Sequence, residues 1–195
     1  MTELAPPPTI PLEVDDLVAL DRPIRVEEYM RLPEGPPYPE LIHGELHVNP
    51  PPLLRHQRTL LRLVLILEAV RPAHLEVLPA PIGWRASPFD VPEPDIVVCN
   101  RTQDLHQHLV EEVPSLCVEV LSPSNRRHDT VRKRRLYEAH GVPSYWIVDP
   151  HPDNGPWLLA LELRDGTYRA VHDGTERFEA TLPFPVSVDP GQLLD

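Results

Sequence analysis

The strongest periodic pattern along the chain is a helical repeat of apolar positions over residues 53–71. From Leu60 to Leu67 the segment is apolar on nearly every side, apart from Arg62. Because a helix that is apolar all round needs partners on more than one side, the pattern predicts a deeply buried helix. The same apolar surface suggests a homodimer, although a mixed sheet within one subunit would also bury it. His56 lies near the start of this helix, and its side chain either has a structural role or points into a functional site.

Shorter segments carry the patterns of strands. Residues 38–48 predict a hairpin around His43-Gly44, in which Glu40 lies opposite His47. Period-two alternation places Glu40 and Glu45 on one face, which is either a wall of a site or the solvated side of the hairpin. Buried strands and a final antiparallel hairpin are expected further along, at 96–99, 116–121, 144–148 and 157–178.

The remaining segments complete the predicted domain. Short helices are expected over 26–32 and 128–140, and the polar stretch 101–113 is expected to be a loop with a helical turn. Residues 1–24 hold prolines and acids with little periodicity, so we expect an extended N-terminal arm, followed by a single domain over 25–195. The order of elements predicts a mixed α/β (α+β) fold, with a central mixed sheet flanked by helices and extra strands added.

Composition is that of an ordinary globular protein, with 41% hydrophobic and 25% charged residues. The formal charge of −12 argues against a protein that coats nucleic acid with a generally basic surface, but leaves room for a local basic patch. No segment is apolar over the roughly 20 residues of a membrane span, and the N-terminus lacks the pattern of a signal peptide. We therefore expect a cytoplasmic protein. Cys99 and Cys117 lie in apolar runs and are expected to be buried hydrophobic residues.

Two carboxylates stand out because of where the strand pattern places them. Glu119 lies in the middle of the apolar run 116–121, and Asp95 immediately precedes the run 96–99. A charge inside a buried strand must be paired, protonated or bound to a metal ion. Glu119 is therefore either part of a site or one half of a structural salt bridge with an arginine.

Lys133 is the one lysine among the 18 lysine and arginine residues of the sequence. A helical wheel places it on the same stripe as Leu136 and Tyr137, while its arginine neighbours point the other way. Lysine is a compact charge whose pKa shifts readily, whereas arginine is a planar fork that stays protonated. Lys133 is expected to point inward and reach Glu119, unless it is a solvated charge or only pairs with Asp129 along the helix.

Strand carboxylates, an inward lysine and a further acid on the hairpin suit metal-assisted hydrolysis of phosphodiesters. Hard carboxylate oxygens hold Mg²⁺ while leaving places for water and a phosphate oxygen. The ion lowers the pKa of bound water and offsets the charge that develops on the phosphoryl group. Metal-dependent hydrolysis of a small phosphoester would use the same acids.

A series of short motifs runs along the chain: Glu27-Glu28-Tyr29, Tyr38 to Glu45, His56-Gln57, Pro94-Asp95, Val118 to Pro123, Asp129, Lys133, Tyr137, Gly141-Val142-Pro143, Tyr145 to Pro150 and Leu182-Pro183-Phe184. In this order they resemble the Uma-two (Uma2) family of restriction-endonuclease-like proteins, a bacterial group in the PD-(D/E)xK nuclease superfamily. The resemblance extends from about residue 24 to the end of the sequence.

The resemblance implies a restriction-endonuclease-like core and a DNA endonuclease that requires Mg²⁺, for which Mn²⁺ can substitute. It implies Asp95 and Glu119 as the metal-binding pair and Glu40 as an additional acid at the metal. It also implies Lys133 as the catalytic lysine. Glu45 is the second choice for the third acid.

Leu121 stands where the superfamily usually has its lysine, and the resemblance places that lysine on the following helix instead. Phosphate recognition is expected from a basic cluster beside the site, formed by Arg126, Arg127, Arg132, Arg134 and Arg135. A protein of a different class is also compatible with the sequence: a catalytically silent nucleic-acid or protein interaction module on the same fold. The complete set of acids and lysine favours the enzyme. The charge of −12 favours the module, or a substrate limited to ends, flaps or single strands.

Overall fold

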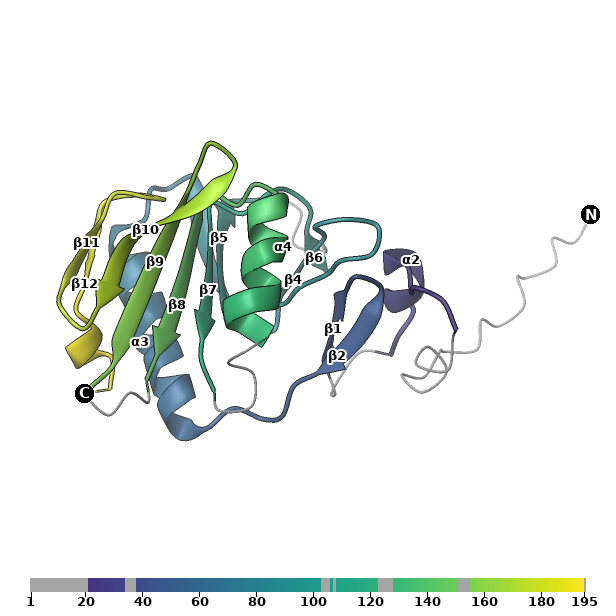
Figure 1. Cartoon of the computed structure of the whole chain (residues 1–195), viewed down its shortest axis with the longest axis horizontal. Helices are drawn as coiled ribbons and strands as arrows, with labels where there is room; N and C mark the ends of the chain where they lie inside the picture. The colour runs from purple at the N-terminus through teal and green to yellow at the C-terminus, as the bar shows by residue number, and fades with distance from the viewer. Residues whose placement is uncertain are drawn as a thin grey trace, which may run out of the picture.

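A six-stranded sheet lies at the centre of the structure, a computed structural model that describes residues 21–33, 38–102, 106, 108–122, 128–150 and 155–194 (Figure 1). The strands follow the order β10-β9-β8-β7-β5-β3. Their bounds are β3 Leu75–Pro79, β5 Ile96–Asn100, β7 Leu116–Val120, β8 Ser144–Asp149, β9 Trp157–Arg164 and β10 Thr167–Gly174. Strands β7 and β8 run parallel and the other neighbours run antiparallel, which makes the sheet mixed as predicted.

Helices cover both faces of this sheet. The parallel connection from β7 to β8 contains a π-helical turn, His128–Lys133, which continues into α4, Arg134–Ala139. Helix α3, Leu54–Val70, lies against the opposite face, and Figure 1 shows the sheet between the two helices. Because strands in such a layer are buried on both sides, β7 and β8 are buried at every position, and their residues are apolar apart from Glu119, Ser144 and Asp149.

Alternate residues of β7 enter two separate cores. Val118 and Val120 pack in one cluster with Leu63 of α3. Cys117 packs in the other cluster with Leu136 of α4. The strand therefore presents its odd-numbered residues, Glu119 among them, to the face that α4 covers.

The long helix is present, but the expectation that it is buried on several sides is wrong for the single chain. Its buried stripe is His56, Thr59, Leu63 and Leu67, which faces the sheet. Leu61 and Leu65 on the opposite side are 57% and 55% exposed. One sheet face covers one stripe of a helix, and no other described element packs on the outer stripe.

The hairpin forms as the sequence predicts, from β1, Pro39–Ile42, and β2, Glu45–Val48. Ile42 lies opposite Glu45, and Glu40 opposite His47. His43 and Gly44 at the turn both have positive φ, 54° and 76°. A Cβ on Gly44 would lie 2.6 Å from Cβ of Pro23, so the turn needs glycine for its space as well as its φ. The hairpin lies beside the central sheet (Figure 1) and pairs through Leu41 with Val91.

Short elements account for the differences from the sequence expectations. The helix expected over 26–32 is α2, Val26–Tyr29, and is shorter at its end. The stretch expected to be a loop contains β6, Leu109–Val110, which pairs in parallel with β4, Gly83–Trp84. Strand β3 was not expected. The chain ends in β11, Phe178–Ala180, and β12, Val186–Val188, followed by a 3₁₀ turn over Pro190–Gln192.

Other expectations concern single residues and the chain ends. Cys99 and Cys117 are buried free thiols, as predicted. No helix in the described part of the chain is long and apolar enough to cross a membrane. Most of the predicted N-terminal arm, residues 1–20, lies outside the described residues, whereas Ile24 packs in a small core with Leu41 and Val91.

Candidate active site

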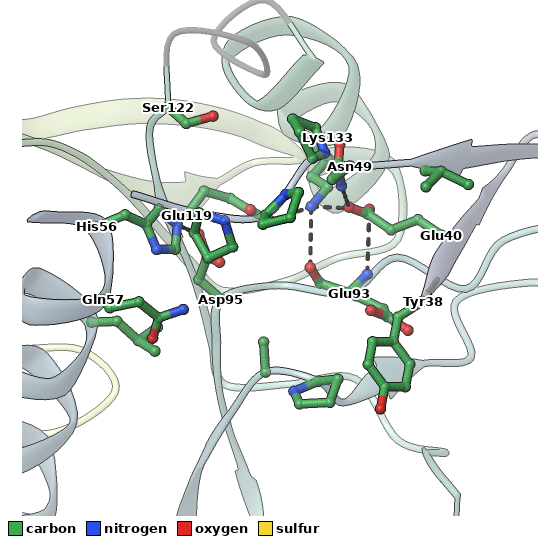
Figure 2. Close-up of a pocket in the computed structure, with 17 residues that line it drawn as sticks. Tyr38, Glu40, Asn49, His56, Gln57, Glu93, Asp95, Glu119, Ser122 and Lys133 are labelled. Atoms are coloured by element: carbon green, nitrogen blue, oxygen red, sulfur yellow. Dashed lines mark hydrogen bonds and ion pairs between the residues drawn. The ribbon is translucent and has the colours of Figure 1, made fainter. Parts of the chain in front are cut away.

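A pocket of about 910 Å³ opens where the hairpin, the start of α3 and the ends of β5 and β7 meet (Figure 2). Antiparallel pairing sets Ile96 of β5 opposite Val118 of β7. One step further along the same register places Asp95 opposite Glu119, and both line the pocket. The structure thus brings together the two carboxylates that the strand pattern singled out.

Lys133 reaches this pair from the π-helical turn. Its Nζ lies 2.9 Å from Oε1 of Glu119, and the two side chains are almost fully buried, with 2% and 1% of each residue exposed. The hydroxyl of Tyr137 donates to the same Oε1 at 2.7 Å. The inward direction predicted for Lys133 is confirmed, and this lysine is a partner of Glu119. π-helical turns are frequent at functional sites, and here the turn ends on the lysine.

Glu40 of the hairpin is the third acid in this cluster. One of its oxygens, Oε2, lies 3.0 Å from Nζ of Lys133, and the other accepts from Nδ2 of Asn49 at 2.7 Å. Glu40 is 2% exposed, so the Glu40 end of this face forms a wall of the site, whereas the Glu45 end is solvated. The side chain of Glu45 is 69% exposed and lies near His47, away from the pocket lining.

The compact shape of an ammonium explains why a lysine fits here. An ammonium has three N–H donors, and within the described part of the chain Nζ of Lys133 lies near Glu119 at 2.9 Å, Glu40 at 3.0 Å and the backbone carbonyl of Glu93 at 3.2 Å. Figure 2 shows these acceptors arranged around the nitrogen. The planar fork of an arginine is larger and would place its nitrogens elsewhere.

Asp95 is held at the end of the sheet by groups from two elements. Its Oδ2 accepts from the backbone N–H of Val120 at 2.7 Å and lies 3.2 Å from Nε2 of His56. His56 is buried and lines the pocket from α3. Of the two roles that the sequence left open for this histidine, the structure therefore favours the one at a site.

Glu93 is a pocket residue that sequence reasoning missed. Burial and the nearby charge of Glu40 raise the pKa of its carboxyl to about 7, although Lys133 and a hydrogen bond from Tyr29 act in the opposite direction. Asn49 was missed as well, because nothing in its local pattern distinguishes it from other loop residues. The acid of Glu93 did carry a signal, since it sits two residues before Asp95 in a proline-rich entry to a strand.

The predicted basic cluster is described only in part. Arg126 and Arg127 lie outside the described residues. Arg135 is exposed, Arg134 is half-buried, and Nη1 of Arg132 lies 3.4 Å from Nε2 of His47 on the hairpin. Burial, followed by the charge of Arg132, lowers the pKa of His47. At least Arg132 therefore lies next to the hairpin that carries Glu40.

The carboxylate oxygens of these acids are suitable ligands for a divalent cation, but the side chains are not already arranged around a metal position. Within the described ranges, no three His, Cys, Asp or Glu side chains are gathered as a metal site. The physical reason is that the ammonium of Lys133 lies between Glu40 and Glu119. Asp95 and Glu119 still lie opposite each other and offer hard oxygens to the pocket. This donor set suits Mg²⁺, which usually takes one or two carboxylates and keeps several waters.

Comparison with known proteins agrees with this fold. The sequence model of the Uma2 family, described as "Putative restriction endonuclease", matches residues 26–190. A crystal structure described as "a putative nuclease belonging to DUF820 from Anabaena variabilis ATCC 29413" has a TM-score of 0.69 and 19% identity, over 88% of this chain and 98% of that chain. At that identity the likeness shows a shared fold. None of the curated proteins compared with the chain matches it.

Proposed function

The chain belongs to the Uma2 family, and from this premise we propose that it is a Mg²⁺-dependent endonuclease that hydrolyses phosphodiester bonds of DNA. One observation carries the proposal: the buried ammonium of Lys133 contacts Glu119 at 2.9 Å, in a pocket that Asp95 also lines. Burying these charges costs free energy, so a cluster of this kind is expected where chemistry requires it. The family description and the nuclease description of the structural neighbour are consistent with the same activity.

Each residue of the site has a distinct role in the proposal. Asp95 and Glu119 hold the divalent ion, with Glu40 as the further acid of the set. Bound there, the ion would lower the pKa of water and offset charge on the phosphoryl group. Lys133 orients the attacking water and adds positive charge where negative charge develops. Glu40 also holds the ammonium in place, since its Oε2 lies 3.0 Å from Nζ.

A catalytically silent interaction module on the same fold is the second candidate. The net charge of −12 is the observation that favours it, because a polyanion is repelled by the chain as a whole. In the nuclease proposal this charge instead limits the substrate to DNA ends, flaps or single strands. Phosphates are then bound by the local arginines, Arg126, Arg127, Arg132, Arg134 and Arg135. Binding should be weak and fall steeply with salt, since each phosphate contact releases counterions.

A panel of labelled duplex, nicked, flapped and single-stranded DNA tests the proposal. We expect cleavage of at least one substrate with Mg²⁺ or Mn²⁺ and none with Ca²⁺, which fits oxygen ligands but activates water poorly. A matched RNA strand checks the choice of DNA. If no substrate is cleaved in the presence of Mn²⁺, the interaction module becomes the better account.

The proposal includes a homodimer formed through the outer stripe of α3. Leu61 and Leu65 expose 57% and 55% of their surface there, and such apolar patches mark interfaces. Light scattering at micromolar concentration should give twice the 22.2 kDa of one chain. The double variant Leu61→Glu/Leu65→Glu should give the mass of one chain. A monomeric wild type would contradict this part of the proposal.

A further inference from the structure

The carboxylate of Asp95 has two donors on the same oxygen. The backbone N–H of Val120 donates to Oδ2 at 2.7 Å, and Nε2 of His56 lies 3.2 Å from it. A carboxylate oxygen accepts, so this contact is a hydrogen bond in the tautomer whose Nε2 carries the proton of the imidazole. The backbone fixes one direction of approach and the imidazole fixes a second. Together they restrict the rotation of the carboxylate.

The carboxylate of Glu119 follows the same arrangement. The hydroxyl of Tyr137 donates to Oε1 at 2.7 Å, and Nζ of Lys133 donates to that oxygen at 2.9 Å. The phenol ring is itself fixed, since it packs edge-on against Tyr145 with ring centroids 4.9 Å apart. A buried ring of this kind holds its hydroxyl in one place.

We propose that His56 and Tyr137 are positioning residues, which orient Asp95 and Glu119 for binding a divalent cation. This inference rests on the proposed function, since it concerns the same carboxylate pair. His56 acts from α3 and Tyr137 acts from α4, so the two faces of the sheet each supply one support. Partners of this kind fix the orientation of metal-binding side chains and contribute to affinity without touching the ion.

His56 and Tyr137 differ from ordinary buried polar residues because their polar atoms contact the two carboxylates of the proposed metal site. Tyr168 is a useful contrast, because it is also buried but its hydroxyl donates to the backbone carbonyl of Val142 at 2.9 Å. Tyr168→Phe therefore removes a hydrogen bond of similar length without touching either acid. Tyr137→Phe removes the hydroxyl at Glu119 and leaves the ring contacts in place.

Calorimetric titration of Mn²⁺ into the full chain tests the inference. Tyr137→Phe and His56→Leu should each weaken Mn²⁺ binding about 10- to 100-fold relative to wild type. His56→Gln should recover part of the loss, because its amide nitrogen can donate at a similar reach. Tyr168→Phe should bind Mn²⁺ like wild type although it loses a buried hydrogen bond. In cleavage assays, raising the Mn²⁺ concentration should restore activity to the two weakened variants.

Binding and cleavage answer separate questions in this design. Wild-type affinity in both folded Tyr137→Phe and folded His56→Leu would overturn the positioning roles, as would an equal loss in Tyr168→Phe. If His56→Leu does not fold, the comparison of Tyr137→Phe with Tyr168→Phe decides the matter for the hydroxyl, and His56→Gln decides it for the imidazole. A wild type that binds Mn²⁺ but cleaves nothing overturns the nuclease proposal alone, whereas a wild type that binds no Mn²⁺ overturns both.

Discussion

The two faces of the central sheet are built from alternate residues of the same strands, yet they differ in chemistry. On the α3 face, β7 contributes Leu116, Val118 and Val120 to a tightly packed apolar core. On the α4 face the same strand contributes Glu119, which contacts Lys133. Successive residues of one strand point to opposite faces of the sheet, so β7 contributes to an apolar core on one face and to the site on the other. We infer that the α3 face mainly stabilises the fold, while the α4 face and the adjoining end of the sheet carry the site.

Glu119→Gln is expected to have the largest effect, and on activity. Replacing the carboxylate removes a metal ligand in the proposed site, so cleavage should fall by roughly 10²–10³-fold or more. Stability should change by only about 1 kcal/mol, because Lys133 keeps Glu40 at 3.0 Å. Single-turnover cleavage and urea unfolding measure the two quantities. Loss of several kcal/mol of stability with unchanged cleavage would show a structural salt bridge instead.

Leu116→Ala makes the matching change on the opposite face of the same strand. The side chain is fully buried, so the cavity should reduce the free energy of unfolding by about 2–5 kcal/mol. The rate of cleavage by the folded variant at saturating Mn²⁺ should remain close to that of wild type. A rate loss comparable to that of Glu119→Gln would mean that the two faces are not separable.

Glu93→Gln tests the acid whose pKa is raised to about 7 from its ordinary 4.5. The folded state keeps a proton that the unfolded state releases, so wild-type stability falls as pH rises from about 4.5 to 7. The loss amounts to at most about 3 kcal/mol. Gln cannot ionise, so the free energy of unfolding of the variant should rise relative to that of wild type between pH 5 and pH 8. Urea unfolding in EDTA measures this difference. A difference between the two proteins that is the same at both pH values would contradict this pKa.

Arg164→Ala should have the smallest effect. Its Nη2 lies 2.8 Å from Oε2 of Glu162, which is the distance of a good ion pair, but the arginine side chain is 60% exposed. Exposed pairs contribute about 0–1 kcal/mol, so we expect a change in unfolding free energy below about 0.5 kcal/mol. A loss above 2 kcal/mol would show that the short distance of an ion pair determines its contribution to stability more than burial does. It would then weaken the contrast between this exposed pair and the buried pair of Lys133 and Glu119.

Much of the fold was predictable wherever local pattern and tertiary structure agree. The hairpin register followed from the His43-Gly44 turn, and the buried strands followed from apolar runs. Strand β4 was not predictable, because Gly83 and Trp84 form a strand only by pairing with Leu109 and Val110, far away in the sequence. The outer stripe of α3 was predictable as apolar surface, but the sequence left open whether the same subunit covers it, because an apolar pattern does not say how many neighbours a helix has.

The site was predictable in its acids and lysine but not in their supports. Glu119 was conspicuous as a charge inside an apolar run, and Lys133 as the one lysine of the sequence. Asn49 contacts Glu40 from a loop, and this contact leaves no local pattern in the sequence. Glu93 contacts Glu40 from a strand entry, and its position two residues before Asp95 was the one sign of it in the sequence. His56 was recognisable as a candidate, but only the contact with Asp95 separates a site residue from a structural one.

Lys133→Arg is the measurement that tests the central claim most directly. The change keeps the positive charge but replaces the compact ammonium, whose nitrogen lies within 3.2 Å of three acceptors, with a larger planar fork. On a substrate that wild type cleaves with saturating Mn²⁺, and with circular dichroism showing a folded protein, we expect a rate at least about 100-fold lower. Lys133→Ala should be only slightly less active than Lys133→Arg. Cleavage by Lys133→Arg at the wild-type rate would contradict the claim that the site requires this lysine.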